Sequence, residues 1–422
     1  MSRRMRYAVI TLLCCVVATQ SIRAQTGGQT RDLQYYTGIA LAGSPLLKDY
    51  AGQAAINSLD SLIGRAAYRP QVAAALDGRY APGIAGFHYD RTNIDEKNLG
   101  ALLTVSQTIV GGRNLGAQMA SYGIAAQGLG NARKISEHDL RLAVATQYIV
   151  SWGALQEAQY NGDILSLLVR EELMLKKLTE KAVYKQTDYL NFEVGMHQQQ
   201  LLVDQLRAGY RDQIALLNYL CGIVDTTQVA LEAPNIALLP PPAFEATLQY
   251  DKFFIDSLRL NNSAKLIDYA YRPKLSAYAD GGYSSTFVST PQKNFGASIG
   301  LSLSIPIYDG GQRQREHNKI KTSEQIRSYY RDFAKRQYDQ QVADLFRQLA
   351  QTDTVIAQAE QVIKYSQALI DAYGKQMQTG EASITDYMNA LANLIIARQA
   401  LTRNNTTKLQ IISQINYWNN EE

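Results

Sequence analysis

The residue types that most often carry out chemistry in enzymes are sparse in this sequence. Its four histidines lie far apart, and none forms a His-x-x-x-His or His-Glu-x-x-His pair that could hold a metal ion: His88, His138, His197 and His317. There is no Gly-x-Ser-x-Gly elbow for a nucleophilic serine and no phosphate-binding P-loop. Cys221 is the only cysteine beyond residue 24, so it has no disulfide partner within the remaining chain. We therefore predict no enzymatic activity, no metal site and no cofactor.

Short motifs instead repeat once, in the same order, in the two halves of the chain. Residues 187–191 (Thr-Asp-Tyr-Leu-Asn) return as residues 385–389 (Thr-Asp-Tyr-Met-Asn), 198 positions later. An Arg-Pro pair at 69–70 returns at 272–273. Motifs that recur in the same order indicate an internal duplication, and such a duplication determines the overall architecture more strongly than any local pattern. The first repeat is predicted to cover residues 25–237 and the second 249–422. The linker 238–248 contains Pro240–Pro242, through which no helix could run.

The start of the chain resembles a secretory signal peptide, residues 1–24. Arg3, Arg4 and Arg6 precede a twelve-residue apolar stretch, Tyr7–Ala18, which is too short to span a bilayer as a helix. The chain is expected to be exported, to be cut after Ala24, and to have no helical membrane anchor. If it enters a membrane, it does so with strands.

Charge argues against a nucleic-acid partner. The chain has 42 Lys+Arg and 38 Asp+Glu, and four of the arginines lie in the predicted signal peptide, which has no acidic residue. The remainder has 38 charges of each sign. A nucleic-acid-binding protein needs a basic excess to displace phosphate counterions.

Each repeat contains two strand-like runs after its Arg-Pro pair. The clearest alternates apolar residues with Ser, Gly and Pro, so one face is fully apolar: Phe295, Ala297, Ile299, Leu301, Leu303, Ile305 and Ile307. Such a face fits either a half-buried strand of a soluble sandwich or a strand facing lipid. The small polar residues opposite, and a length near the 9–11 residues that span a membrane, favour lipid. Strands are predicted at about 70–81, 98–110, 273–287 and 294–308.

Long helices follow the strands, at about 113–181 and 311–378. Both stretches lack proline and are rich in Ala, Gln, Leu and Glu. At 1.5 Å per residue, such helices reach roughly 100 Å. Return helices at about 188–222 and 384–418 are half as long, and a short helix before each Arg-Pro pair would stack on them. The fold class is thus mostly α with strands.

Four strands per chain cannot close into a barrel, and open strand edges are not tolerated in lipid. A membrane barrel would therefore be shared between subunits of a symmetric oligomer.

With these features, the sequence resembles the TolC-like outer-membrane efflux protein family (outer membrane factors). Residues 299–311 resemble its most recognisable motif, and residues 103–112 resemble the first-half twin of that motif. The resemblance implies a homotrimer whose twelve strands form one β-barrel, with a long periplasmic α-helical tunnel. It also implies a channel, the exit duct for efflux of small molecules or secretion of proteins. The implied partners are a periplasmic adaptor protein and an inner-membrane pump or secretion transporter, with the barrel in outer-membrane lipid.

The resemblance also places an entrance gate where the long helices reverse. Asp188 and Asp386 match family aspartates that ring the closed entrance, and three copies of each would attract cations. An acid in the first turn of a helix is equally a common helix cap, and for Asp386 we weigh the two roles evenly. Tyr189 and Tyr387 could line the constriction, although such rings more often pack between helices. Asn389 stands where a second ring acid is often found.

The reversal near residue 380 is, by the same resemblance, the candidate adaptor-docking tip. Its residues are Gly380, Glu381, Ser383 and Ile384. Gly380 is expected to adopt the left-handed conformation that ends a helix and lets the chain turn back. The first reversal, residues 182–188, lacks a glycine.

One alternative is a soluble periplasmic coiled-coil adaptor or scaffold that uses its strands in a small sandwich. It would need a second layer to cover the apolar face of residues 295–307, and the sequence offers no obvious one.

Overall fold

The computed structural model describes residues 30–82, 95–110, 112–225, 229–285 and 293–419. The predicted signal peptide lies outside these residues. Among the helices that are described, none combines the length and the apolar character needed to cross a membrane.

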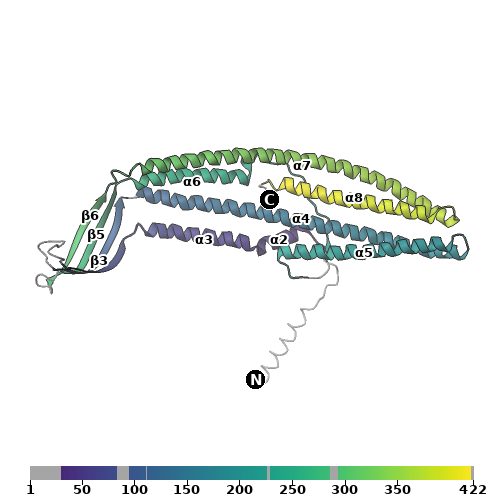
Figure 1. The fold of residues 1–422 in the computed structure, drawn as a ribbon, viewed down its shortest axis with the longest axis horizontal. Helices are drawn as coiled ribbons and strands as arrows, with labels where there is room; N and C mark the ends of the chain where they lie inside the picture. Colours follow the sequence, from purple (N-terminus) through teal and green to yellow (C-terminus); the bar gives the residue numbers. More distant parts are fainter. Residues whose placement is uncertain (1–29, 83–94, 111, 226–228, 286–292, 420–422) are drawn as a thin grey trace, which may run out of the picture. The chain divides into compact units, whose positions relative to one another are not determined.

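Helices and strands follow the same general order in both halves of the chain (Figure 1). The first half contains α2 (Leu33–Gly43), α3 (Pro45–Ala66), β2 (Gln71–Pro82), β3 (Asp95–Val110), α4 (Gly112–Glu180) and α5 (Gln186–Cys221). The second half contains α6 (Leu248–Ala270), β5 (Lys274–Ser285), β6 (Phe295–Ser304), α7 (Gln312–Thr379) and α8 (Ile384–Asn416). The two-residue strands β1 (Thr30–Arg31) and β4 (Ala230–Leu231) form a separate parallel pair.

The single short helix expected before the first Arg-Pro pair is in fact two helices. Ser44 ends α2 and caps α3, because its hydroxyl accepts a hydrogen bond from the Leu47 amide at 3.4 Å. Pro45 then occupies the first turn of α3, where the missing N–H removes no helical hydrogen bond. The Ser-Pro pair was the sequence signal for this break.

The four longer strands form one antiparallel sheet in the order β2-β3-β5-β6. The pairing of β3 with β5 joins the two repeats. Four residues, one from each strand, align in a row across the sheet: Val72, Val105, Ala279 and Ile299. The next row, on the opposite face, is Ala73, Thr104, Asp280 and Ser298. The alternation seen along one strand therefore extends across the whole sheet.

The described chain forms two compact units, and each unit draws on both repeats. One unit comprises residues up to Gly43, Leu140–Leu238 and Arg347–Gln414; the other comprises Ser44–Asp139, Leu239–Phe346 and the residues from Ile415 onward. Residues of the two repeats pack together inside each unit. In the first unit, Leu168 and Phe192 share a buried cluster with Leu391. In the second, the Asn262 amide donates to the Ala117 carbonyl at 2.9 Å.

The second repeat begins its first helix at the last residue of the predicted linker. Helix α6 starts at Leu248, after Thr247 caps it by accepting from the Tyr250 amide at 3.3 Å. The linker before it is held by its neighbours in the same unit. The Leu239 amide donates to Asn416 Oδ1 at 2.9 Å, and the Tyr338 hydroxyl donates to the Pro242 carbonyl. The linker is thus anchored by these polar contacts and by the buried Phe244 ring, which packs against Tyr250 of α6 and Tyr338 of α7.

Candidate functional site

The apolar face of the sheet is exposed along β6. Ile299 is 87% exposed, and Phe295, Leu301 and Leu303 are also exposed. Ala297 lies on the same face, between Phe295 and Ile299. The strand ends at Ser304 rather than near residue 308, so Ile305 and Ile307 lie beyond it, although both are exposed. Pro306 has no N–H to give to a strand ladder, which explains the earlier end.

The two reversals at the far ends of the long helices have the same backbone geometry. After α4, the Val183 amide donates to the Leu178 carbonyl at 2.9 Å; after α7, the Glu381 amide donates to the Gln376 carbonyl at 3.0 Å. This is the Schellman motif, which requires a left-handed residue just before the donor. Gly380 has φ +77° and Ala182 has φ +59°. The conformation expected of Gly380 is confirmed, and alanine takes the same place in the glycine-free turn.

Replacing Ala182 with glycine is expected to stabilise the first turn. A left-handed alanine is strained by roughly 1–2 kcal/mol, and part of that gain is lost to the greater freedom of glycine in the unfolded chain. We expect a net increase of about 0.5–1 kcal/mol in the free energy of unfolding, measured by denaturant titration. The control Ala372→Gly, at an exposed position inside α7, should lower it by about 1 kcal/mol. A destabilised Ala182→Gly variant would contradict the strain at this turn.

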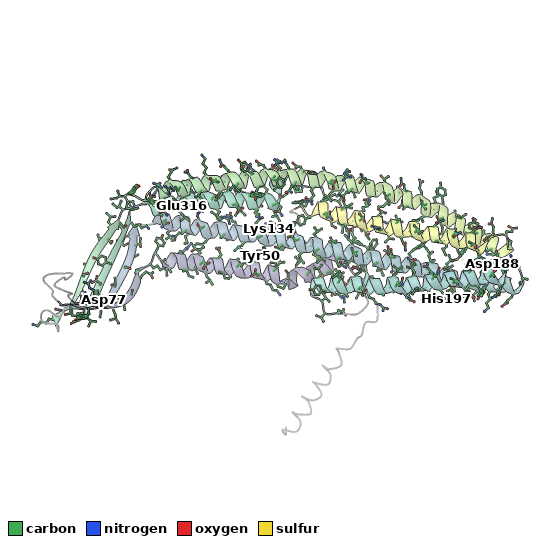
Figure 2. All side chains as sticks on the ribbon, viewed as in Figure 1. Tyr50, Asp77, Lys134, Asp188, His197 and Glu316 are labelled. Atoms are coloured by element: carbon green, nitrogen blue, oxygen red, sulfur yellow. The ribbon has the colours of Figure 1, made fainter. Side chains whose placement is uncertain are left out.

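The two repeated aspartates have different surroundings. Asp188 is half-buried, and its Oδ2 accepts from the Lys185 amide at 3.3 Å, so it caps the start of α5 (Figure 2). Asp386, in the first turn of α8, is exposed, and its carboxylate has no hydrogen bond or ion pair with any described residue. Asp188 therefore has the helix-capping role that was considered for Asp386, and the carboxylate without a hydrogen-bond partner is that of Asp386.

The two repeated tyrosines also differ. Tyr189 is half-buried, and its hydroxyl lies 2.6 Å from Glu193 Oε1 and 2.7 Å from Glu172 Oε1. Hydrogen bonding to Glu193 and Glu172 raises the pKa of Tyr189, because ionisation of the hydroxyl would break these bonds and place a third negative charge beside the two carboxylates. Glu193 Oε2 lies 3.4 Å from Nε2 of the exposed His197 (Figure 2).

Tyr387 is only 1% exposed and belongs to the buried cluster of the reversals. Burial raises its pKa to about 12. The assignment of Tyr387 to the lining of the gate is therefore wrong, because its ring fills the space between helices of its own chain. Asn389, two residues on, is exposed.

Three of the four docking-tip candidates are exposed: Gly380, Glu381 and Ser383. Ile384 is the exception, since it is 3% exposed and packs in the same cluster as Tyr387. Its assignment to a docking surface is corrected, because an apolar residue at the first position of α8 faces the core of the hairpins.

Sequence reasoning missed Tyr184, in the turn before α5. Its hydroxyl lies 2.9 Å from the Ala382 carbonyl oxygen and 3.1 Å from the Met377 carbonyl oxygen, both of the other reversal. The signal was present, because the 198-residue offset that aligns the aspartates also aligns Tyr184 with Ala382. A large aromatic residue in one turn can pack against a small residue at the equivalent position of the other turn.

Known proteins resemble this chain in sequence and in fold. Residues 259–415 match the family model described as "Outer membrane efflux protein". The "Outer membrane protein TolC" of Escherichia coli is 26% identical over 234 residues, which cover 51% of this chain and 45% of that protein. The matched region thus spans about half the length of this curated relative.

Solved structures match over nearly the whole chain. The structure of CusC, described with transmembrane channel formation, has a TM-score of 0.76 at 14% identity and covers 95% of both chains. The outer membrane protein VceC of Vibrio cholerae has a TM-score of 0.72 at 13% identity, covering 92% of this chain and 95% of its own. The chain has the fold of the TolC-like outer membrane efflux proteins. The sequence resemblance and the fold class are thereby confirmed, and the matched proteins are outer-membrane proteins by name, in agreement with the expected localisation.

The matched family model is described as one of efflux proteins, not of enzymes. Among the described residues, no group of three or more His, Cys, Asp or Glu side chains is placed to hold a metal ion. His317, one of the scattered histidines, lies 2.9 Å from Asp268 Oδ1, which also accepts from Arg313 at 2.8 Å. Asp268 thus joins an ion pair with Arg313 and a contact with His317 between α6 and α7.

Proposed function

We propose that this TolC-like chain is one protomer of an oligomeric channel in the outer membrane, which serves as the exit duct for efflux or secretion. The supporting observation is the apolar row across all four strands. Ile299 is 87% exposed and Val72 is 63% exposed, although both are large aliphatic side chains. No described layer of this chain covers that face, and β2 and β6 have no further partner among the described strands.

Contact with lipid would cover the apolar face, and pairing with neighbouring copies would cover the open edges of β2 and β6. Lipid covers an apolar face without cost, and neighbouring copies pair with the two free edges. With three copies, as the resemblance implies, the shared barrel has twelve strands. A periplasmic adaptor would engage the reversals, and an inner-membrane transporter would supply the cargo. The rival, a soluble periplasmic adaptor, would leave the same face in water.

Conductance tests the function directly. We expect the purified, detergent-extracted protein to form ion-conducting channels in planar lipid bilayers. A protein that stays soluble and leaves the bilayer current unchanged would contradict the proposal and favour the adaptor.

Within this function, Asp386 is proposed as the entrance residue that selects cations, and Asn389 as its exposed neighbour on α8. Three unpaired carboxylates around one axis would together favour cations by about 0.6–1 kcal/mol in a water-filled opening. We expect Asp386→Asn to lower the cation-to-anion permeability ratio about threefold to fivefold, measured from reversal potentials in a salt gradient.

The repeat supplies a matched control. Asp188→Asn weakens the cap of α5 and should lower the free energy of unfolding by about 0.5–1 kcal/mol, without changing the permeability ratio. Equal effects of the two substitutions on permeability would contradict the assignment to Asp386.

A further inference from the structure

A groove with a volume of about 980 Å³ lies between α4 and α8, and α5 contributes Gln213 to it. All of its lining residues belong to the compact unit that contains Leu140–Leu238 and Arg347–Gln414. The volume is within the range of about 300–1,000 Å³ that is typical of small-molecule sites. The apolar residues that line it include Val150, Ala154, Ile396 and Ala400, and the charged ones are Glu157 and Arg403.

The groove lies on the side of α4 that faces away from the N-terminal elements of the same unit. Tyr148 of α4 packs in a buried cluster with Tyr36 of α2 and Leu231 of β4. Glu157 is nine residues further along, or about two and a half helical turns, so its side chain lies on the opposite face of α4. The elements α2 and β4 therefore cover one face of α4, and the groove occupies the other.

Two contacts between α4 and α8 set the spacing of these helices around the groove. A Cβ built on Gly153 would lie 2.5 Å from Thr406 Cγ2, so the helices approach each other closely at this glycine. Further along α4, the Arg398 guanidinium lies over the Tyr160 ring, 5.2 Å from its centroid. Glu157 lies between Gly153 and Tyr160 in the sequence, so both contacts hold the groove in shape around it.

Glu157 is half-buried in the groove, and its carboxylate has no hydrogen bond or ion pair with any described residue. Burial raises the pKa of this carboxyl group. A carboxylate that is withdrawn from water without a partner is costly, and a positive charge placed beside it offsets that cost. The groove therefore offers an unmatched site for a cation.

The arginines of α8 do not supply this positive charge. Neither Arg398 nor Arg403 forms an ion pair with Glu157, and the Arg398 guanidinium is stacked on Tyr160. Arg403 is exposed, so water already solvates its guanidinium at the edge of the groove. The group that lacks a partner is thus the carboxylate, which shares the groove with apolar side chains.

We propose that the groove between α4 and α8 binds an amphipathic organic cation. Its positive group pairs with Glu157, and its apolar body covers Val150, Ala154 and Ile396, the last of which is 64% exposed. Binding of the cation is independent of the channel function. The further role of such cations as cargo rests on the channel function proposed above.

Tetraphenylphosphonium, a cation with a large apolar body, is the probe for this site. Calorimetric titration of the full-length protein in an uncharged detergent, with the titration of empty micelles subtracted, should show about one bound cation per chain. We expect Glu157→Gln to weaken binding about tenfold, because the neutral amide no longer attracts the positive charge. Glu157 has no bond to lose, so the variant should unfold at the wild-type temperature.

Asp163→Asn is the matched control. Asp163 is an exposed carboxylate on the same helix and does not line the groove, so this variant should bind the cation with wild-type affinity. Anilinonaphthalene sulfonate, an anion with an apolar body, serves as the second probe. We expect it to bind more weakly than the cation and to be unaffected by Glu157→Gln.

The outcomes separate the cation site from the channel. Absence of cation binding to the wild-type protein, or equal weakening by Glu157→Gln and Asp163→Asn, would overturn the site. Tighter binding of the anion, lost in Arg403→Gln, would overturn the choice of a cation as the ligand. A wild-type protein that binds the cation as described but forms no channels would overturn the proposed function and leave the site in place.

Discussion

Replacing Ile299 with arginine is expected to remove the protein from the outer membrane. Ile299 lies in the middle of β6, 87% exposed, in register with Ala279 of β5. An arginine on the lipid face near the bilayer midplane costs about 2–4 kcal/mol. Three copies in one barrel would cost about 6–12 kcal/mol, which is comparable to the stability of an ordinary domain. We expect the amount in the outer-membrane fraction to fall more than about tenfold, measured by immunoblot.

The opposite face of the same strand provides the control. Ser302 is aligned with Ser276 on the polar face of the sheet. Ser302→Arg should assemble at close to the wild-type amount, because a polar barrel interior tolerates charge. If both arginine variants assembled equally well, the apolar face would not be in contact with lipid. If both were lost, the Ser302 face would be buried as well, which contradicts a polar, water-filled barrel interior.

Tyr387→Ala is expected to destabilise the reversals strongly. The ring is 1% exposed and packs with Leu391 and Met377, so its removal leaves a cavity that the helices cannot easily fill. Large-to-small changes of buried aromatics cost about 3–5 kcal/mol. Thermal unfolding of the detergent-extracted protein should show a lowered transition for Tyr387→Ala and a much smaller change for Tyr387→Phe.

Asn389→Ala is the control for Tyr387, because Asn389 is exposed two residues further along α8. It should change the free energy of unfolding by less than about 0.5 kcal/mol. A stable Tyr387→Ala variant with an altered conductance would contradict the packing role and return Tyr387 to the lining of the entrance.

The sequence made the strands and their faces predictable, because the period of two is explicit from Phe295 to Leu303. Its continuation to Ile307 was misleading. Alternation of residue types persists past the last ladder hydrogen bond, and Pro306 was the better indicator of the strand end. The break at Ser44 was missed for a related reason: a long apolar-periodic stretch hid a local capping signal.

The roles of the repeated residues could not be read from the repeat itself. Identical residues at 188 and 386, and at 189 and 387, lie in different environments because their neighbours differ. The Tyr184 side chain occupies one turn where Ala382 occupies the other, although both turns offer a backbone amide three residues before the aspartate, at Lys185 and at Ser383. Duplication predicts equivalent backbone, and this is what Gly380 and Ala182 show. It does not predict which of two equivalent side chains is buried, since burial depends on contacts between the repeats.

The central claim is that strands of several copies close one barrel in the outer membrane. Membrane fractionation, followed by size analysis of the detergent-extracted protein with and without heating, tests it most directly. The account predicts an outer-membrane species near three times the mature mass that dissociates to a single chain on heating. A soluble monomer in the periplasmic fraction would contradict it, because four strands with open edges cannot remain in lipid.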